Sequence, residues 1–370
     1  MFTKIPHFTV MLVLAGLLAG SNLQAARTIT DAAGRTVEIP DSVSRVICSG
    51  PGCLRLLTYL QAEDLIVAVD DIETRRRSFD ARPYALANPE FKSMPIFGEF
   101  RGHDNPELIV SLDPQPQVIF KTYPTMGHDP EELQAKTSIP VVVLNYGNLD
   151  ELRPELETSL RVMGKVIGKA DRADEVITFF NSVIADLNSR TQDIPRNKRP
   201  SVFIGGVAFK GPHGYRSTEP GYPPFEFVNA DNVARTPGPG GKILRQADVA
   251  KEQIVVWDPD VLFLDLATLQ LGSGASGLHE LKTDPAYQIL TAVREGRVYG
   301  LLPYNWYTTN FGSILANAYF IGKLLYPQQF EDITPEARAD QIYEFLLGEP
   351  VFEDMNAMFQ GLAFEPIPLN

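Results

Sequence analysis

The sequence predicts an α/β protein with two similar parallel-sheet lobes that are bridged by a long interdomain α-helix. Two observations carry this fold class. A segment with an acidic start, a short helical stretch, Asp-Pro and an apolar β-rich run occurs twice, at residues 107–120 and 252–263. Between the copies, residues 150–190 repeat apolar side chains at helical spacing. The length of 370 residues also suits about two domains.

The repeated segment reads ELIVSLDPQPQVIF in its first copy and EQIVVWDPDVLF in its second. We expect each helical stretch to end before Pro114 or Pro259, because proline lacks an amide hydrogen and disfavours helical geometry in the residue before it. The apolar runs 118–120 and 261–264 then predict buried strands of parallel sheets. Two such units imply two lobes of similar construction.

The first lobe is expected to open with a hairpin over residues 27–40 that turns near Gly34. Further strands follow from short apolar runs, and a helix follows the first of them. These elements are a strand at 45–47, a helix at 54–60, and strands at 66–69 and 141–144. Alternation of strands and helices predicts a parallel sheet.

The bridging helix is predicted from Leu152, Leu156 and Leu160, which recur at four-residue steps and are followed by a second series from Val176. Gly164 or Gly168 could break it. We therefore expect a first lobe over residues 26–149, a bridging helix over 150–195 and a second lobe over 196–370. At 1.5 Å per residue, about 40 helical residues would reach about 60 Å.

Residues 1–25 have the pattern of a cleaved secretory signal peptide: Lys4, an apolar core at 8–20 and a small exit residue, Ala25. The core is too short to span a membrane. Ser21 stands where a bacterial lipoprotein would carry its lipidated cysteine, so we expect a free periplasmic protein. The net charge of −13 argues against binding to nucleic acid.

Cys48 and Cys53 are the only cysteines. Their spacing matches neither a CxxC redox pair nor a four-ligand zinc site. An exported protein passes through an oxidising compartment, so a disulfide is one alternative and two buried thiols beside a tight loop are the other.

The segments ITDAAGRTVEIPDSVSRVI and FGEFRGHDNPELIVSLDPQPQVIF, together with the order of the other elements, resemble the periplasmic binding proteins of iron-siderophore, haem and cobalamin importers. The resemblance covers essentially the whole mature chain. It implies a monomeric, non-enzymatic solute-binding component of an ABC importer that delivers a metal chelate, foremost a ferric siderophore, to an inner-membrane permease. It also implies that Glu107 and Glu252 dock into arginine pockets of that permease. Capping of a helix start is their alternative role.

In a fold of this kind, the loops at the carboxyl ends of parallel strands face the ligand cleft. Four segments therefore supply candidate ligand-binding residues, with Arg101 matching an arginine of hydroxamate-siderophore binders. The candidates are Ser49, Gly50 and Gly52; Arg101; His213, Tyr215, Arg216 and Tyr222; and Tyr304, Trp306 and Tyr307. Their alternatives are a plain turn, a surface salt bridge, a surface loop and burial of Trp306 in the core.

A bound metal ion or cofactor is not expected, because the histidines of the mature chain are scattered and form no HxxH or HExxH arrangement. Any metal should arrive inside a chelator. Molybdate or tungstate, haem and cobalamin remain alternative ligands. A chelatase-like enzyme is a further alternative, which export of the chain disfavours and for which no nucleophile motif is present.

Overall fold

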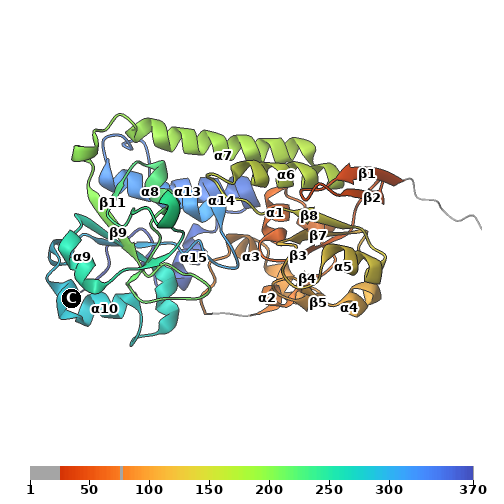
Figure 1. The fold of residues 1–370 in the computed structure, drawn as a ribbon, viewed down its shortest axis with the longest axis horizontal. Helices are drawn as coiled ribbons and strands as arrows, with labels where there is room; N and C mark the ends of the chain where they lie inside the picture. Colours follow the sequence, from red (N-terminus) through yellow and green to blue (C-terminus); the bar gives the residue numbers. More distant parts are fainter. Residues whose placement is uncertain (1–25, 76–77, 370) are drawn as a thin grey trace, which may run out of the picture.

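The computed structural model describes residues 26–75 and 78–369, so the predicted signal peptide lies outside the described residues. Figure 1 shows two lobes side by side and one long helix, α7, that runs along both of them. Each lobe contains a parallel sheet with helices packed on it. The predicted fold class is confirmed.

The chain starts with the expected hairpin, in which β1 (Ala26–Thr30) pairs antiparallel with β2 (Thr36–Pro40). Asp31 forms its turn by accepting hydrogen bonds from the Ala33 and Arg35 amides. The same carboxylate accepts a bond of 3.1 Å from the amide of Val143. One aspartate therefore both closes the hairpin and attaches it to the first sheet.

The first sheet has three parallel strands in the order β3 (Val46–Ser49), β7 (Val118–Thr122) and β8 (Val141–Leu144). A second small sheet holds β4 (Val69–Asp70), β5 (Ile96–Glu99) and β6 (His103–Asp104). The strand expected at 66–69 is wrong in its extent. Ile66 makes a single bridge to Val46, whereas Val69 pairs with Ile96. The start of this run therefore contacts the first sheet, and its end belongs to the second.

The second lobe holds a four-stranded parallel sheet. Its order is β11 (Asp231–Asn232), β9 (Ser201–Gly205), β13 (Val261–Asp265) and β14 (Val298–Leu301). A separate antiparallel pair, β10 (Ser217–Thr218) and β12 (Ala247–Asp248), lies beside it.

The internal repeat occupies the same place in both lobes. The strand β7 lies between β3 and β8, and β13 lies between β9 and β14. The helix α4 (Pro106–Ser111) precedes β7, and α9 (Lys251–Trp257) precedes β13. Each helix ends before its Asp-Pro dipeptide, as predicted from the backbone chemistry of proline.

The bridging segment consists of two helices, α6 (Arg153–Ile167) and α7 (Ala170–Thr191). They are separated at Gly168, which has a φ of +74° and ends α6 in the left-handed conformation that glycine adopts without strain. Of the two predicted break points, Gly168 is the one used. The helix α7 alone spans about 33 Å, and α6 packs against it (Figure 1).

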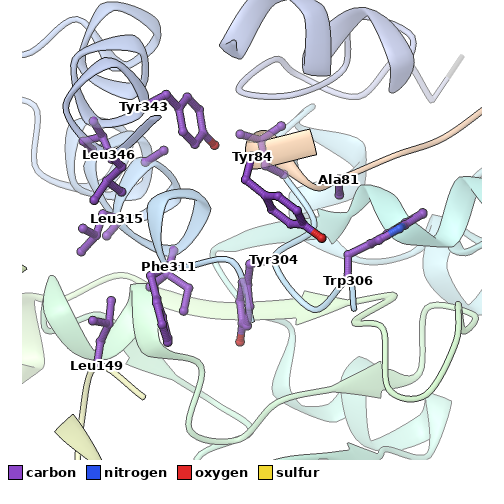
Figure 2. Close-up of a cluster of buried hydrophobic side chains, with 14 of the residues drawn as sticks. Ala81, Tyr84, Leu149, Tyr304, Trp306, Phe311, Leu315, Tyr343 and Leu346 are labelled. Carbon is purple, nitrogen blue, oxygen red and sulfur yellow. The ribbon is translucent and has the colours of Figure 1, made fainter. Parts of the chain in front are cut away.

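One apolar core continues from the first lobe into the second, and α13 (Phe311–Leu325) is its centre, with 13 buried residues among its 15. The helix α14 (Pro335–Leu347) packs on α13, on α1 (Cys53–Tyr59) and on α3 (Pro83–Ala87). The lobes therefore share apolar contacts besides α7. Figure 2 shows this junction, where Tyr84 of α3 lies near Tyr304 and Trp306.

The remaining helices are α2 (Asp71–Thr74), α5 (Pro130–Thr137), α8 (Pro223–Phe227), α10 (Gly277–Thr283), α11 (Pro285–Gln288), α12 (Thr291–Arg294) and α15 (Phe352–Met358). Of these, α2, α5 and α12 pack against strands and the others pack against neighbouring helices. None of the helices in the described part of the chain is both long and apolar enough to cross a membrane.

Candidate functional site

The two lobes meet at loops that follow the carboxyl ends of parallel strands, which is where sheets of this class bind ligands. From the second lobe comes the segment Trp306–Thr309, which follows β14. From the first lobe come Arg55, Asp70, Tyr123 and Tyr146. We call these residues together the interlobe contact.

Hydrogen bonds hold the interlobe contact together. The Arg55 guanidinium donates to the backbone carbonyls of Trp306 (3.2 Å), Tyr307 (3.2 Å) and Thr309 (2.9 Å). The Tyr146 hydroxyl donates to the Thr309 carbonyl at 2.7 Å, and the hydroxyls of Tyr123 and Thr308 are 2.8 Å apart. Every one of these bonds crosses from one lobe to the other.

Tyr307 makes two further bonds between the lobes. Its hydroxyl donates to Asp70 Oδ2 at 2.5 Å and accepts from the Arg101 backbone amide at 3.1 Å. Tyr307 and Thr308 both have positive φ angles, 46° and 64°. Such strain in non-glycine residues persists only where surrounding contacts impose it, and it concentrates at functional sites. Here Asn310 holds the loop by donating to the carbonyls of Tyr304 and Trp306.

Arg55 is the buried positive charge of this contact. It is 1% exposed, and its Nε has no hydrogen-bond partner. Its guanidinium lies 4.9 Å from the centre of the Tyr84 ring, in the position of a cation–π contact. Burial acts to lower the pKa of Arg55, but Tyr146 and other neighbouring phenols offset this and raise it. Among residues 26–75 and 78–369, no carboxylate lies within ion-pair distance of Arg55, so its charge faces neutral oxygens.

Next to Arg55 lies a buried network in which charges are paired. Arg82 forms a fork with Asp80, at 2.8 and 2.7 Å, and bonds to Glu73 at 2.7 Å. The Tyr84 hydroxyl donates to the other oxygen of Glu73 at 2.6 Å. Burial and the neighbouring Glu73 raise the pKa of Asp70 to about 8. Asp70 is therefore mostly protonated at neutral pH and contributes no full negative charge beside Arg55.

Two acids of the second lobe, the buried Asp265 and the half-buried Glu219, have no such pairing. Asp265, at the end of β13, caps the Ala267 amide with one oxygen, while its Oδ2 has no partner. Burial raises the pKa of Asp265 to about 7. Glu219 accepts a hydrogen bond from the Tyr304 hydroxyl, and burial raises its pKa to about 7 as well. Near neutral pH, each of these carboxyl groups is close to half protonated.

The predicted glycine loop of the first lobe is tightly packed. A Cβ atom on Gly50 would lie 2.5 Å from the Thr122 carbonyl, and one on Gly52 would lie 2.2 Å from the Tyr146 ring. These glycines thus permit close approach of the chain to the interlobe contact. Ser49, which directly precedes Gly50, is buried. Its hydroxyl donates a hydrogen bond to Asp104 at 2.9 Å and accepts one from Lys121 at 3.0 Å. Because the Ser49 hydroxyl already makes these bonds to the ion pair of Lys121 and Asp104 and the residue is buried, Ser49 is not accessible to a ligand in this structure.

Of the other predicted ligand residues, Arg101 and Tyr307 lie at the interlobe contact. Arg101 is exposed, and its guanidinium lies 5.1 Å from the Phe100 ring. Trp306 is largely buried, and only its carbonyl takes part in the contact. Burial of Trp306 was the alternative that the sequence left open.

The predicted aromatic residues of the second lobe do not line a cleft here. Tyr215 and Tyr222 are fully buried, because they pack edge to face with Tyr287 and Phe225 in the second-lobe core. Tyr304 is also buried and bonds to Glu219. The expectation that these rings face a ligand is corrected: each lies on the inner side of its loop.

The two polar candidates of the same region are engaged at the surface. Arg216 is exposed and forms an ion pair with Asp248 at 2.7 Å. His213 is half-buried, and its Nε2 lies 2.8 Å from the Phe209 carbonyl. For this segment the sequence left a surface loop as the alternative, and the positions of Arg216 and His213 agree with it.

Sequence reasoning missed Arg55, Asp70 and Tyr146. All three follow parallel strands: Arg55 after β3, Asp70 at the end of β4 and Tyr146 two residues after β8. The rule of carboxyl strand ends would have found Asp70 and Tyr146 had it been applied to every strand. Arg55 carried a weaker signal, a single arginine inside the apolar helix CLRLLTY.

Comparison with known proteins shows which family this two-lobed fold belongs to. The model of the periplasmic binding protein family matches residues 46–304, which is more than half of the chain and includes both halves of the internal repeat. The chain belongs to the periplasmic binding protein family. The family predicted from the sequence is thereby confirmed.

Two relatives show how far the likeness extends. The molybdate-binding protein MolA of Haemophilus influenzae is 24% identical over 363 residues, covering 90% of this chain and 95% of MolA. The structure of MolA bound to molybdate matches with a TM-score of 0.65 at 20% identity, covering 88% and 98% of the two chains. A periplasmic solute-binding protein of Veillonella parvula matches with a TM-score of 0.68 at 18% identity, covering 90% and 97%. At these identities the structural matches establish the fold. The relatives are named as binding proteins, in agreement with a role other than catalysis.

In this periplasmic binding protein, Glu107 and Glu252 are both exposed in the first turns of α4 and α9, which lie in opposite halves of the molecule (Figure 1). Asn105 caps α4 by accepting bonds from the Glu107 and Leu108 amides. Because a neutral side chain already caps that helix, the Glu107 carboxylate is available for another contact.

Cys48 and Cys53 are free thiols in the structure, and both are buried. Burial and the neighbouring Cys53 raise the pKa of Cys48. Of the two alternatives left by the sequence, the structure has the buried thiols. Within the described ranges, no cluster of three or more His, Cys, Asp or Glu residues could hold a metal ion.

Proposed function

We propose that this periplasmic binding protein is the solute-binding component of an ABC importer and that its ligand is a small tetrahedral oxyanion of the molybdate or tungstate class. The observation that carries the ligand class is Arg55, a buried guanidinium between the lobes that faces only neutral acceptors. A guanidinium offers five donors in a fixed fork that suits oxyanions.

The chemistry of the interlobe contact supports an anion. The carbonyls of Trp306, Tyr307 and Thr309 now accept the hydrogen bonds of Arg55. An oxyanion between the lobes would replace some of these neutral acceptors with charged ones, and a guanidinium and an oxyanion form short hydrogen bonds that are frequently bidentate. The hydroxyls of Tyr123 and Tyr146 provide further donors on the same face. The whole-length similarity to molybdate-binding MolA agrees with this proposal.

The ferric siderophore suggested by the family resemblance has less support. That hypothesis relied on aromatic rings at Tyr215, Tyr222, Trp306 and Tyr307 to cover the body of a chelate. The first three side chains are buried, and only Tyr307 lies at the interlobe contact, where its hydroxyl is bonded to Asp70 and to the Arg101 amide. Haem and cobalamin would need an apolar wall of the same kind. Arg101 remains an exposed donor that a chelate could use, so the two ligand classes are separated by experiment.

Calorimetric titration with molybdate, tungstate, sulfate, a ferric hydroxamate and haem tests the ligand class. We expect saturable binding of molybdate or tungstate, and loss of Arg55 should weaken it about 10- to 100-fold, the range for a hydrogen bond to a charged group. Arg55→Lys keeps the charge and Arg55→Gln removes it. Arg196→Gln, at an exposed ion pair with Asp231, is the matched control. Tight binding of the hydroxamate or haem with no response to any oxyanion would contradict the proposal.

Delivery to a permease is the second part of the proposal. Glu107 and Glu252 would each contact a basic side chain of the permease, one from each lobe, and charge reversal would turn that attraction into repulsion. Glu107→Arg and Glu252→Arg should each abolish most ligand uptake while ligand affinity stays within twofold. Glu131→Arg is a matched control, because Glu131 is likewise an exposed acid in the first turn of a helix, α5. Normal uptake by both reversal variants would refute the docking role.

Export as a lipid-free protein completes the proposal and rests on residues 1–25. The intact mass of the exported protein should match a chain that starts near Ala26. An added diacylglycerol mass would contradict it.

A further inference from the structure

The strand β7 carries a charged residue on a face that is otherwise apolar. Side chains alternate along a strand, so Ile119 and Lys121 point to the same face of the first sheet. On the neighbouring strand β3, Ile47 and Ser49 are the partners of these two residues. The two isoleucines belong to a small apolar core that also contains Phe97 of β5. Lys121 thus places a positive charge at the end of this core.

The ammonium group of Lys121 is fully buried and is bonded to three acceptors. It donates to Asp104 Oδ2 at 2.7 Å, to Ser49 Oγ at 3.0 Å and to the Gly102 carbonyl at 3.3 Å. The side chains of Lys121 and Asp104 are both 0% exposed. A lysine has only three donors, so none remains for a ligand. Any role of Lys121 in binding is therefore exerted through its partners.

These partners belong to both sheets of the first lobe. Lys121 and Ser49 lie in the first sheet, whereas Asp104 lies on β6 of the small second sheet. Gly102 lies in the turn of residues 100–102 that joins β5 to β6. We call residues 100–102 the β5–β6 turn. One ammonium group therefore fastens this turn to the first sheet.

The β5–β6 turn has a strained conformation. Arg101 and Gly102 have φ angles of 64° and 74°, and a residue other than glycine keeps such an angle where surrounding contacts impose it. The Gly102 carbonyl accepts hydrogen bonds from Lys121 Nζ at 3.3 Å and from the His128 amide at 3.2 Å. A Cβ atom on Gly102 would lie 2.9 Å from Lys121 Nζ. The turn is thus packed directly on the buried ammonium group.

The β5–β6 turn also touches the second lobe. The Arg101 amide, one residue before Gly102, donates to the Tyr307 hydroxyl at 3.1 Å. The centres of the Phe100 and Tyr307 rings are 6.1 Å apart. The bond from Lys121 to the Gly102 carbonyl is therefore one residue away from a contact between the lobes.

The glycine loop, residues 49–52, reaches the second lobe as well. A Cβ atom on Gly52 would lie 2.6 Å from Thr308 Cγ2, so the loop and Thr308 are in contact. The loop leaves β3 at Ser49, whose hydroxyl bonds to both Lys121 and Asp104. The same buried ion pair thus holds two of the first-lobe segments that meet the second lobe.

The energetics of buried charges indicate that this ion pair does more than stabilise the lobe. Taking two charges out of water is costly, and their replacement by apolar groups of similar volume is often neutral or stabilising. Asp104 Oδ1 is buried and has no hydrogen-bond partner among the described residues, which adds to the cost. An apolar pair, however, could donate no hydrogen bond to the Gly102 carbonyl or to the Ser49 hydroxyl. The placement of these two groups is what the ion pair adds.

We propose that Lys121 is a positioning residue of the ligand site. Its ammonium group places the β5–β6 turn and the glycine loop against the second lobe, and so holds the interlobe contact around Arg55 in the geometry that receives the oxyanion. This inference rests on the proposed function and adds a residue that acts without touching the ligand. Binding to a site that is already ordered is tighter, because less conformational freedom is lost when the ligand arrives.

Replacement of the ion pair by apolar groups separates positioning from stability. The double variant Lys121→Met with Asp104→Leu removes both charges together, so no buried charge is left unpaired. Ser49→Ala is the milder variant, because it removes one hydroxyl and leaves the ion pair. Thr137→Val is the matched control for Ser49→Ala: it removes a buried first-lobe hydroxyl that makes two hydrogen bonds, on α5. Should the double variant fail to fold, Ser49→Ala decides by the same measurements.

Hydrogen exchange of the ligand-free protein measures the positioning, and calorimetry with molybdate measures its effect on binding. In the double variant we expect faster amide exchange both in residues 97–105 and, across the lobes, in residues 304–310, with little change in melting temperature. Molybdate affinity should fall about tenfold in the double variant and about threefold in Ser49→Ala, as for the loss of one hydrogen bond. Thr137→Val should stay within about twofold of the wild-type protein. In a Tyr307→Phe background the double variant should cost less affinity, because the interlobe bond through which Lys121 acts is already gone.

Three results would overturn the inference. In the first, faster exchange stays confined to residues 97–105, which makes Lys121 a structural residue of the first lobe alone. In the second, the folded double variant binds molybdate as tightly as the wild-type protein does. In the third, it loses the same affinity with and without the Tyr307 hydroxyl, which separates Lys121 from the interlobe bond. Absence of oxyanion binding by the wild-type protein would instead contradict the proposed function, and exchange in residues 304–310 would still decide the role of Lys121.

Discussion

Buried charges at the junction of the lobes are handled differently on its two sides. In the first lobe, Arg82 pairs with Asp80 and Glu73 in a closed set of short hydrogen bonds. In the second lobe, Asp265 and Glu219 have no arginine or lysine within ion-pair distance among the described residues, and burial raises the pKa of each to about 7. A paired set keeps its charges in place, whereas an unpaired buried acid reduces its cost by binding a proton.

This difference matters for an anionic ligand. Because Asp265 and Glu219 are each about half protonated near neutral pH, they repel an oxyanion less than two fully charged carboxylates would, and a proton on Asp70 removes a negative charge next to Arg55. The paired network uses Glu73 and Asp80 to neutralise Arg82 and leaves Arg55 as the uncompensated cation. The junction thus presents one positive charge without a matching negative one.

The largest effect, on the free energy of unfolding, should come from removing Arg82, the cation of the paired network in the first lobe. Arg82→Met keeps much of the side-chain volume but leaves Glu73 and Asp80 buried without their cation. We expect the free energy of unfolding to fall by about 3–5 kcal/mol, as when one partner of a buried ion pair is removed. Urea denaturation followed by circular dichroism measures it. Asp265→Asn is the comparison, because it removes an unpaired acid and should cost far less. Equal losses for the two variants would show that pairing does not distinguish the two sides.

A smaller effect is expected in the pH dependence of stability. A raised pKa means that the folded protein binds a proton that the unfolded chain has already lost, so stability falls as the pH rises between the two values. For Asp265 this interval runs from about pH 4, the usual range for an aspartate, to about pH 7. Each pKa unit corresponds to about 1.4 kcal/mol. Asp265→Asn should therefore flatten the decline in unfolding free energy across this interval, with little change in slope above it. An unchanged slope would mean that Asp265 is not buried as an acid.

Tyr307→Phe tests the hydrogen bonds by which the Tyr307 hydroxyl of the second lobe joins the first lobe. It removes the hydroxyl that bonds Asp70 and the Arg101 amide, without removing the ring. We expect ligand binding to weaken by about 1–2 kcal/mol, because the buried Oδ2 of Asp70 loses the hydrogen bond from Tyr307. Calorimetry at pH 6 and at pH 9 should show a greater loss at pH 9, where Asp70 is charged. Tyr299→Phe serves as control, because the hydroxyl of Tyr299 on β14 makes none of the hydrogen bonds of the interlobe contact. A loss that is the same at both pH values would separate the bond from the ionisation of Asp70.

The smallest effect is predicted for Arg216. Its exposed pair with Asp248 should contribute about 0–1 kcal/mol to stability, and Arg216→Ala should leave oxyanion affinity within twofold. Titrating Arg55→Lys with the same oxyanion by calorimetry compares the loss of affinity at the buried arginine with that at the surface arginine. If Arg216→Ala weakens binding as much as Arg55→Lys does, the ligand lies further into the second lobe than we propose.

The sequence by itself determined the repeat, the fold class and the points where helices stop. These features have local causes: proline ends α4 and α9 through its own backbone, Gly168 divides α6 from α7, and apolar periodicity marks the buried strands. Such signals are readable because each depends on a few consecutive residues.

Only the tertiary structure decided which side chains meet between the lobes. Tyr215 and Tyr222 lie in a loop rich in glycine and proline, where no periodicity says which way a ring points, and the packing of Tyr287 and Phe225 directs them inward. Arg55 lies on α1 beside Tyr84 and Tyr146 of its own lobe. Its remaining hydrogen bonds go to the carbonyls of a segment more than 250 residues later, Trp306–Thr309. Contacts between residues so distant in the chain depend on how the two lobes pack, and no local pattern in either segment records that packing.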